Sequence, residues 1–256
     1  MSANPSSACP NTLGLDDDGD DWEIVVELER AFGLKITDEE AKSIVLVGHL
    51  YDVLLARLGP GSGEKCATAM CYYRLRRATL QNAPNLKVTS KTTLADICQG
   101  NPKLAFRKLG HIAGLTLARP MYGWIGYLGM AMTLVSILGG LFITYLDVLE
   151  PLPGPTLALI CAALFCSGVG LMWADPMQLS RRLDTLGDLA TVTAALNYGQ
   201  LIKEGARHRP QELWEALTEV LSAFRDTLSP KDIHRNTYLL QATFDEACKA
   251  GALKQG

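Results

Sequence analysis

The chain has 256 residues, of which 48% are hydrophobic and 20% are charged, and its formal net charge is −3. The mean hydropathy of +0.11 is high for a soluble chain with this share of charges. Between Arg119 and Arg181 only three residues carry a charge, which leaves two uncharged stretches long enough to span a bilayer. This pattern excludes an ordinary soluble enzyme with a single core.

The N-terminal region is strongly acidic, with eleven acids and two bases in residues 1–41. Residues 1–21 are expected to form an acidic, disordered N-terminus, and they lack the charged and apolar regions of a signal peptide. The aspartates there do not fit a calcium loop. An EF-hand loop with Gly19 at its sixth position would need an acid at Gly14 and a glutamate at Val25.

Residues 22–58 are expected to form amphipathic helices, because apolar side chains recur there at helical spacing. Thr37 is followed three positions later by Glu40, which is the capping-box pattern that starts a helix. The acids of the first helix favour docking to a protein partner with a basic surface, through electrostatic complementarity. The predicted partner-binding residues are Asp18, Asp20, Asp21, Glu23, Glu27 and Glu29.

The stretch from Trp22 to Gly48 reads WEIVVELERAFGLKITDEEAKSIVLVG and resembles the second and third helices of acyl carrier proteins. The family's E-x-x-F-x-x-x-I-x-D-E-E-A segment matches without a gap at Glu29, Phe32, Ile36, Asp38, Glu39, Glu40 and Ala41. In the family, the serine that carries the phosphopantetheine arm stands fourteen residues before the phenylalanine, where this chain has Asp18. A carboxylate cannot form that phosphodiester. The resemblance therefore implies the shape of a carrier protein without its cofactor.

The family's first helix should precede this motif, and the chain offers another source for it in a weak internal repeat. Val47-Gly48-His49-Leu50 is echoed by Leu186-Gly187-Asp188-Leu189, and the V-x-x-x-T-x-L pattern of residues 88–94 is echoed by I-x-x-x-T-x-L at 233–239. The amphipathic segment 213–224 before the second pattern looks like the carrier fold's first helix. Two degenerate carrier-like units are one interpretation, and chance echoes between amphipathic helices are the other.

Residues 57–119 form a basic neck, with eleven bases and two acids, which anionic headgroups would attract. Nucleic acid is not expected as a partner, because zinc-ligand spacing and RNA-binding aromatic patterns are absent from the sequence. The amphipathic segment 101–120 predicts an interfacial helix on the cytoplasmic leaflet, with a core helix of the preceding unit as the alternative. Its charged or titratable side chains include Lys103, Arg107, Lys108 and His111.

The sequence patterns that are typical of catalysis or cofactor binding are incomplete or absent in this chain. The glycine-rich segment 59–65 lacks the Gly-Lys pair and the following Ser or Thr of a phosphate loop, since Glu64 intervenes and Cys66 follows. The seven cysteines include no C-x-x-C pair, and the four histidines show no metal-ligand spacing. The sequence has no G-x-S-x-G motif. We expect reduced thiols and no catalytic residue, cofactor or metal.

Two membrane spans are expected, at Tyr122–Leu146 and Thr156–Ala174, with twenty-five and nineteen uncharged residues. Bases precede the first span and follow the second, and the link between them has none, so the positive-inside rule places both termini in the cytoplasm. Small residues at every fourth position let helix backbones approach closely, either within the hairpin or between protomers. These predicted packing residues are Ser136, Gly140, Thr144, Ala158, Ala162, Cys166 and Gly170.

The sequence therefore predicts an all-α protein, in which a two-helix transmembrane hairpin carries small acyl-carrier-like cytosolic parts. The expected segments are an acidic N-terminus at 1–21, a carrier-like unit at 22–100, an interfacial basic helix at 101–120, the hairpin at 121–175 and a second helical unit at 176–256. We expect a non-enzymatic, multi-pass protein of the bacterial inner membrane that serves protein–protein interaction or scaffolding. The alternative is a membrane-tethered carrier or accessory protein in acyl or polyketide chemistry.

Overall fold

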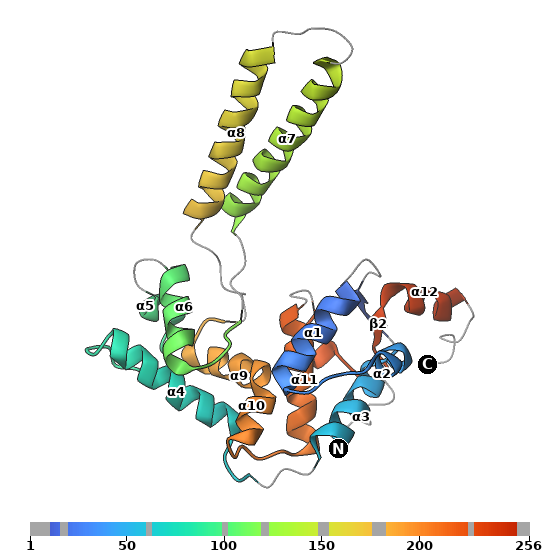
Figure 1. The fold of residues 1–256 in the computed structure, drawn as a ribbon. Coiled ribbons are helices and arrows are strands. Elements are labelled where there is room, and N and C mark those ends of the chain that lie inside the picture. Colours follow the sequence, from blue (N-terminus) through green and yellow to red (C-terminus); the bar gives the residue numbers. More distant parts are fainter. Residues whose placement is uncertain are drawn as a thin grey trace. The chain divides into compact units, whose positions relative to one another are not determined.

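The computed structural model describes residues 11–15, 20–59, 63–98, 102–118, 123–147, 154–175, 183–224 and 228–249. These residues are mostly helical, with one small two-stranded sheet, which confirms the all-α prediction (Figure 1). They divide into two compact units. The helical unit comprises 1–97, 108–118 and 183–256, and the hairpin unit comprises 98–107 and 119–182.

The helical unit is built from elements on both sides of the hairpin in sequence. Before the hairpin stand β1 (Thr12–Leu15), α1 (Asp20–Phe32), α2 (Asp38–Ser43), α3 (Val47–Leu58), α4 (Ala67–Asn82) and α5 (Leu94–Ile97). After it stand α9 (Leu186–Leu196), α10 (Tyr198–Lys203), α11 (Pro210–Phe224), the 3-10 helix η2 (Pro230–Asp232), β2 (Tyr238–Leu240) and α12 (Gln241–Lys249). Helix α6 (Pro102–Ala113) contributes residues to both units.

Capping boxes start two of these helices. At α2 the Thr37 hydroxyl accepts from the Glu40 amide at 3.3 Å, and the Glu40 carboxylate accepts from the Thr37 amide at 2.9 Å, as the sequence pattern predicts. Helix α9 begins in the same way, with Thr185 and Asp188 as the reciprocal pair. Each pair satisfies amide groups that the first turn of a helix leaves without an intrahelical partner.

The main core of the helical unit joins α1, α3 and α11. The buried side chains of α1 recur at helical spacing, from Ile24 through Leu28 to Phe32, and so do those of α11 from Leu213 to Leu221. Ile233, directly after η2, and Leu239 of β2 belong to the same core. An isolated helix as short as α1 is only marginally stable in water. Its stability therefore comes largely from packing its apolar face against helices, such as α11, that lie far away in sequence.

A second helix pair is formed by α4 and α9, which pack against each other (Figure 1). Cys71, Leu75 and Ala78 form the buried face of α4, and Leu186 and Leu189 lie on that of α9. The two helices come from opposite sides of the hairpin in sequence, as do α11 and α3.

The sheet brings the two ends of the described chain together. Strands β1 and β2 are parallel, with Thr12 opposite Tyr238 and Leu15 opposite Leu240. The amide of Tyr238 donates to the carbonyl of Asn11 at 2.7 Å. The segments 22–100 and 176–256, which the sequence divides into two units, thus contribute to one compact unit.

The hairpin unit contains α7 (Trp124–Asp147) and α8 (Gly154–Ala174), which lie side by side (Figure 1). By length and composition, the described part of the chain has one helix able to cross a membrane, with its apolar stretch at Trp124–Phe142. The apolar stretch of α8 with described side chains is shorter, at Leu159–Ala174.

Candidate interaction surfaces

The first repeat motif, Val47 to Leu50, begins α3 and is hydrogen-bonded through its backbone to the segment 235–239, which follows the hairpin in sequence. The amide of Val47 donates to the carbonyl of Thr237 at 2.9 Å, and the amide of Gly48 donates to the carbonyl of Arg235 at 2.9 Å. In the opposite direction, the amide of Leu239 donates to the carbonyl of Val45 at 3.1 Å. The V-G-x-L motif of the first copy therefore meets the I-x-x-x-T-x-L motif of the second copy.

The second repeat motif makes the same contacts with the first copy. The amide of Leu186 donates to the carbonyl of Thr92 at 2.9 Å, and the amide of Gly187 donates to that of Ser90 at 2.8 Å. The amide of Leu94 donates to the carbonyl of Asp184 at 3.0 Å. Every donor and acceptor occupies the position equivalent to that in the first pairing. We call these reciprocal contacts the exchanged pairing.

The residue types of the two motifs explain the exchanged pairing. The amides at the start of α3 and α9 need acceptors from outside their helices, and the partner motifs supply carbonyls. The hydroxyls of Thr237 and Thr92 each accept from the amide three residues before, at 2.8 Å in both cases, and so fix the turn that presents those carbonyls. The glycines permit the close approach. A Cβ at Gly48 would lie 2.7 Å from the Arg235 oxygen, and one at Gly187 would lie 3.0 Å from the Ser90 oxygen.

The helix-connecting loops of the two copies also meet. The amide of Arg207 donates to the carbonyl of Lys65 at 2.8 Å, and the two segments form a parallel bridge at Lys65 and Ala206. Arg74 of α4 pairs with Glu204 beside this bridge. The two copies of the repeat thus contact each other both at their motifs and at their loops.

The acidic helix α1 carries the predicted partner-binding residues, and the structure separates them. Glu23 is exposed. Glu27 pairs with Arg30 at 2.8 Å. Asp20 and Asp21 lie in the first turn of α1, although their side chains and Asp18 are outside the described residues.

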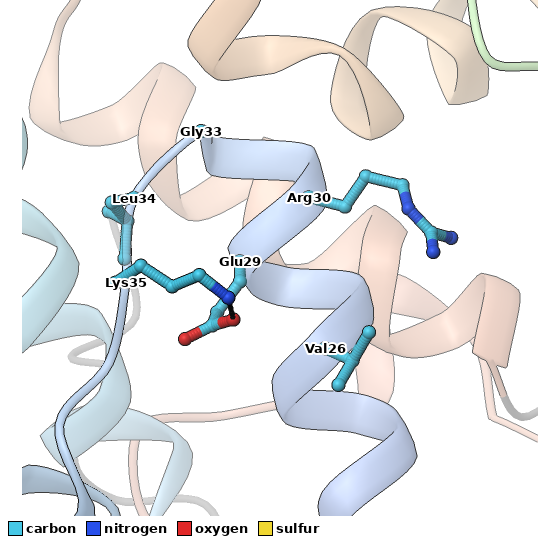
Figure 2. A pocket seen from close by; sticks show the side chains of 6 residues that line it. All are labelled: Val26, Glu29, Arg30, Gly33, Leu34 and Lys35. Atoms are coloured by element: carbon cyan, nitrogen blue, oxygen red, sulfur yellow. Dashed lines mark hydrogen bonds and ion pairs between the residues drawn. The ribbon is translucent and has the colours of Figure 1, made fainter.

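The side chain of Glu29 is mostly buried and lies beside Lys35 (Figure 2). Its carboxylate accepts from the Ile36 amide at 2.8 Å and from Lys35 Nζ at 2.5 Å, and the side chain is only 11% exposed. Burial opposes ionisation of this carboxyl, but these hydrogen bonds outweigh it and hold its pKa below the ordinary value. The surrounding depression is lined by Val26, Glu29, Arg30, Gly33, Leu34 and Lys35. Glu29 thus fixes the turn after α1, whereas Glu23 remains open to a partner.

The hairpin helices contact each other through glycines that the sequence pattern did not single out. A Cβ at Gly168 would lie 2.5 Å from Thr133 Oγ1 and 2.7 Å from the Gly129 oxygen. Ser136, which is buried, donates from its hydroxyl to the carbonyl of Cys161 at 2.6 Å. Gly129 and Thr133 are themselves small residues four positions apart, one turn before Ser136, so the same spacing rule includes this face among its candidates.

The predicted packing residues divide between two sides of the hairpin. Ser136 lies between the helices, whereas Ala162, Cys166 and Gly170 are exposed on α8. A Cβ at Gly140 or at Gly170 would meet no atom within 4 Å. The side chains of Thr144 and Ala158 lie outside the described residues. The contact within the hairpin therefore uses Ser136 but not the described small residues of α8 that the pattern selected.

At one end of the hairpin a hydrogen bond connects the two helices, and exposed aromatic rings lie beside it. Asp175 is buried, and its carboxylate accepts from the Gly123 amide at 2.7 Å, which links the end of α8 to the start of α7. Trp124 is 71% exposed and Trp173 is 85% exposed at this same end. Aromatic rings of this kind are typical of the membrane–water interface.

The titratable groups of the described ranges show how burial changes their chemistry. No group of three or more His, Cys, Asp or Glu side chains there could hold a metal ion. Burial raises the pKa of Cys71 to about 12 and also raises the pKa of Cys98, which disfavours the reactive thiolate of both residues. His208 shares a hydrogen bond with the Tyr198 hydroxyl at 3.1 Å, and burial lowers its pKa. Comparisons with models of protein families, with curated proteins and with solved structures find no significant match to this chain.

Proposed function

We propose that this chain is a non-catalytic integral membrane protein that holds a carrier-like helical unit at the bilayer as a scaffold for a protein partner. The exchanged pairing is the observation that carries the proposal. It closes one compact unit from segments on both sides of the hairpin in sequence. The hairpin is thereby an insertion within a folded unit, which is the arrangement of a membrane anchor.

The exchanged pairing also bears on membrane topology. Val47 and Thr237 are hydrogen-bonded, which supports a shared compartment for the parts of the chain before and after the hairpin. A shared compartment requires an even number of crossings between them. If α7 crosses the bilayer, α8 must return, and this supports two spans rather than one. The bases before and after the hairpin favour the cytoplasm as the shared compartment, in the inner membrane of a bacterium.

The carrier-like character is supported by the shared core of α1, α3 and α11. The resemblance implies a first helix before the recognition helix, and α11 packs against α1 and α3 although it follows them in sequence. The segment with Ile233 and Leu239 closes the same core. We infer that the unit begun by residues 22–58 is completed by the C-terminal segment.

The exposed acids of this unit are the proposed binding surface. Glu23 on α1 and Asp38 and Glu39 on α2 are exposed. The opposite face of α1 is buried, whereas α2 has no buried residue. A partner with basic side chains fits this surface, and electrostatic attraction of this kind gives fast association that salt weakens.

The topology is tested with a protease-sensitive tag at each terminus of the full chain in sealed inner-membrane vesicles. We expect both tags to be cleaved from the cytoplasmic side only, and the protein to resist extraction by alkaline carbonate. Cleavage of the two tags from opposite sides would contradict the shared compartment. Release by carbonate would contradict the membrane anchor.

The scaffold function is tested by capturing partners of the full chain from detergent-solubilised membranes. The variant Glu23→Gln, Asp38→Asn and Glu39→Gln removes three exposed acids. The matched control is Asp232→Asn, Asp245→Asn and Glu246→Gln, which removes three exposed acids from η2 and α12. We expect a partner that is lost with the first variant and in high salt but retained by the control. A partner captured equally by all forms in all salt concentrations would contradict the acidic surface.

A second candidate is a membrane-tethered carrier or accessory protein in acyl or polyketide chemistry. The shared core of α1, α3 and α11 favours it, but the position of the modified serine is occupied by Asp18. Intact-mass measurement after incubation with coenzyme A and a phosphopantetheinyl transferase separates the two functions. An added phosphopantetheine arm would support the carrier, and an unchanged mass would exclude it.

A further inference from the structure

The segment from Ala67 to Leu94, which contains α4 and the loop after it, carries five bases and no acid. One of the five, Arg74, is paired with Glu204 of α10. The other four, Arg76, Arg77, Lys87 and Lys91, are exposed and form no ion pair with any described residue. This part of the helical unit therefore carries four exposed bases that form no ion pair with the described residues.

Arg76 and Arg77 share one face of α4, and Lys87 and Lys91 lie in the loop that contacts this face. On α4, Tyr73, Arg76 and Arg77 stand at the i, i+3 and i+4 positions of one helix face. Opposite them on α4, Cys71, Leu75 and Ala78 are buried. The Nε atom of Arg76 donates to the carbonyl of Val88 at 3.4 Å and so ties the loop to the helix. Lys87 and Lys91 lie within three residues of that contact. We call Tyr73, Arg76, Arg77, Lys87 and Lys91 the basic face.

The basic face contains an exposed aromatic ring among its charges. Tyr73 is 63% exposed. Among the described aromatic rings it contacts only Tyr72, in a T-shaped arrangement with 5.5 Å between the ring centroids. A tyrosine ring has an apolar body and a polar tip, which suits the headgroup layer of a bilayer. Exposed bases beside such a ring fit the headgroup layer of an anionic bilayer, where the phosphates attract the bases and the ring lies at the polar–apolar boundary.

We propose that the basic face binds the anionic phospholipids of the leaflet in which the hairpin is anchored. The inference rests on the proposed membrane anchor, because the tether keeps the bilayer within reach of the helical unit at high effective concentration. Each base close to an anionic surface strengthens binding about fivefold, so three of them contribute roughly a hundredfold. The helical unit is then held on the membrane surface by contacts outside the hairpin.

The test uses the full chain in nanodiscs, with a photo-reactive phenylalanine analogue in place of Tyr73. Discs of neutral phosphatidylcholine are compared with discs that contain phosphatidylglycerol. The patch variant is Arg77→Gln, Lys87→Gln and Lys91→Gln, which leaves Arg76 and its hydrogen bond to Val88 intact. The control variant is Lys42→Gln, Lys231→Gln and Lys249→Gln, which removes three exposed lysines elsewhere. Intact-mass measurement gives the share of protein with a lipid adduct.

We expect lipid adducts in the phosphatidylglycerol discs, a loss of at least about tenfold in neutral discs and in the patch variant, and no loss in the control variant. High salt should also remove the adducts, since it screens exposed charges. Equal adduct yields in the two kinds of disc, or in the two variants, would overturn the proposal. Carbonate extraction of membranes that contain the same proteins distinguishes a failure of lipid binding by the basic face from a failure of the membrane anchor. A protein that stays embedded without forming adducts contradicts lipid binding by the basic face but not the membrane anchor.

Discussion

The amide of Gly48 donates to the carbonyl of Arg235 at 2.9 Å, across 187 residues of sequence. The same contact recurs between Gly187 and Ser90 at 2.8 Å. Each glycine is the second residue of its helix and lies where the partner backbone approaches most closely. The stability of the helical unit should therefore depend on the absence of a side chain at these two positions.

Replacing Gly48 by Ala should destabilise the helical unit. The new Cβ would lie 2.7 Å from the Arg235 oxygen, which is backbone and cannot rotate away. Overpacking of this kind costs about 1–3 kcal/mol of the free energy of unfolding. Gly187→Ala should cost less, because its Cβ would lie 3.0 Å from the Ser90 oxygen. Thermal unfolding in detergent, followed by circular dichroism, measures both changes.

His49→Ala is the matched control for the Gly48 variant, because His49 is the next residue of α3 and is exposed. Its effect should stay within about 0.5 kcal/mol. If Gly48→Ala proves as mild as His49→Ala, the exchanged pairing does not hold the backbones as closely as described.

Within the hairpin, Gly168→Ala and Gly170→Ala should differ. A methyl group at Gly168 would press against Thr133 and the Gly129 backbone, whereas one at Gly170 would meet no atom within 4 Å. We expect the first variant to separate α7 from α8 and to lower the temperature at which the detergent-solubilised protein aggregates. The second should leave it unchanged. A larger effect at Gly170 would instead indicate that the exposed side of α8 is in contact with another protomer.

The partly buried imidazole of His208 should make the helical unit less stable in mild acid. Burial lowers the folded-state pKa of His208, so the unfolded state binds the proton more readily. The stability that this group contributes is present above its unfolded pKa, near 6.5, and is lost as the pH falls below that value. In the protonated ring both nitrogens carry a hydrogen, and Nε2 has no hydrogen-bond acceptor among the described residues.

The measurement for His208 is the unfolding midpoint between pH 7.5 and pH 5.5, about one pH unit on either side of the ordinary histidine pKa. We expect His208→Gln to flatten the pH dependence of the midpoint, and His49→Gln, at an exposed site, to leave it as in the parent protein. A parallel decline in the parent protein and in the His208 variant would assign the acid sensitivity to other groups.

The two acids Glu23 and Glu29 should have separable effects. Glu29→Gln weakens the hydrogen bonds to the Ile36 amide and to Lys35, and should lower the free energy of unfolding by about 1–2 kcal/mol. Glu23→Gln removes an exposed charge and should leave stability unchanged while weakening capture of a basic partner. Thermal unfolding and partner capture on the same preparations separate the two effects. Loss of stability in both variants would place Glu23 in the fold instead of in the binding surface.

Local features of this fold could be predicted from the sequence. The capping box of Thr37 and Glu40 depends on residues three positions apart, and the helical spacing of α1 follows from its own apolar residues. The echo between residues 47–50 and 186–189 was also visible. The sequence does not indicate which copy each motif contacts. A hydrogen bond between residues as far apart as Val47 and Thr237 produces no pattern within either segment.

The contact face of the hairpin was harder to predict for a different reason. In a soluble helix, polar residues indicate the exposed side, but α7 and α8 are apolar on every side. Small residues occur both at Gly129 and Ser136 and at Ala162 and Cys166. Spacing alone could not choose between these faces. The hydroxyl of Ser136 donates to the carbonyl of Cys161, and spacing alone does not predict such a contact.

The exchanged pairing has a consequence for the order of events during synthesis. Helix α3 receives its backbone acceptors from Arg235 and Thr237, which the ribosome adds only after the two hairpin helices. Helices α1 to α4 must therefore wait, exposed and incompletely paired, while the two hairpin helices are made and delivered to the bilayer. A chain that stalls or is cleaved after the hairpin would leave a membrane-bound half with an open core, and such a half is a natural target for chaperones and proteases.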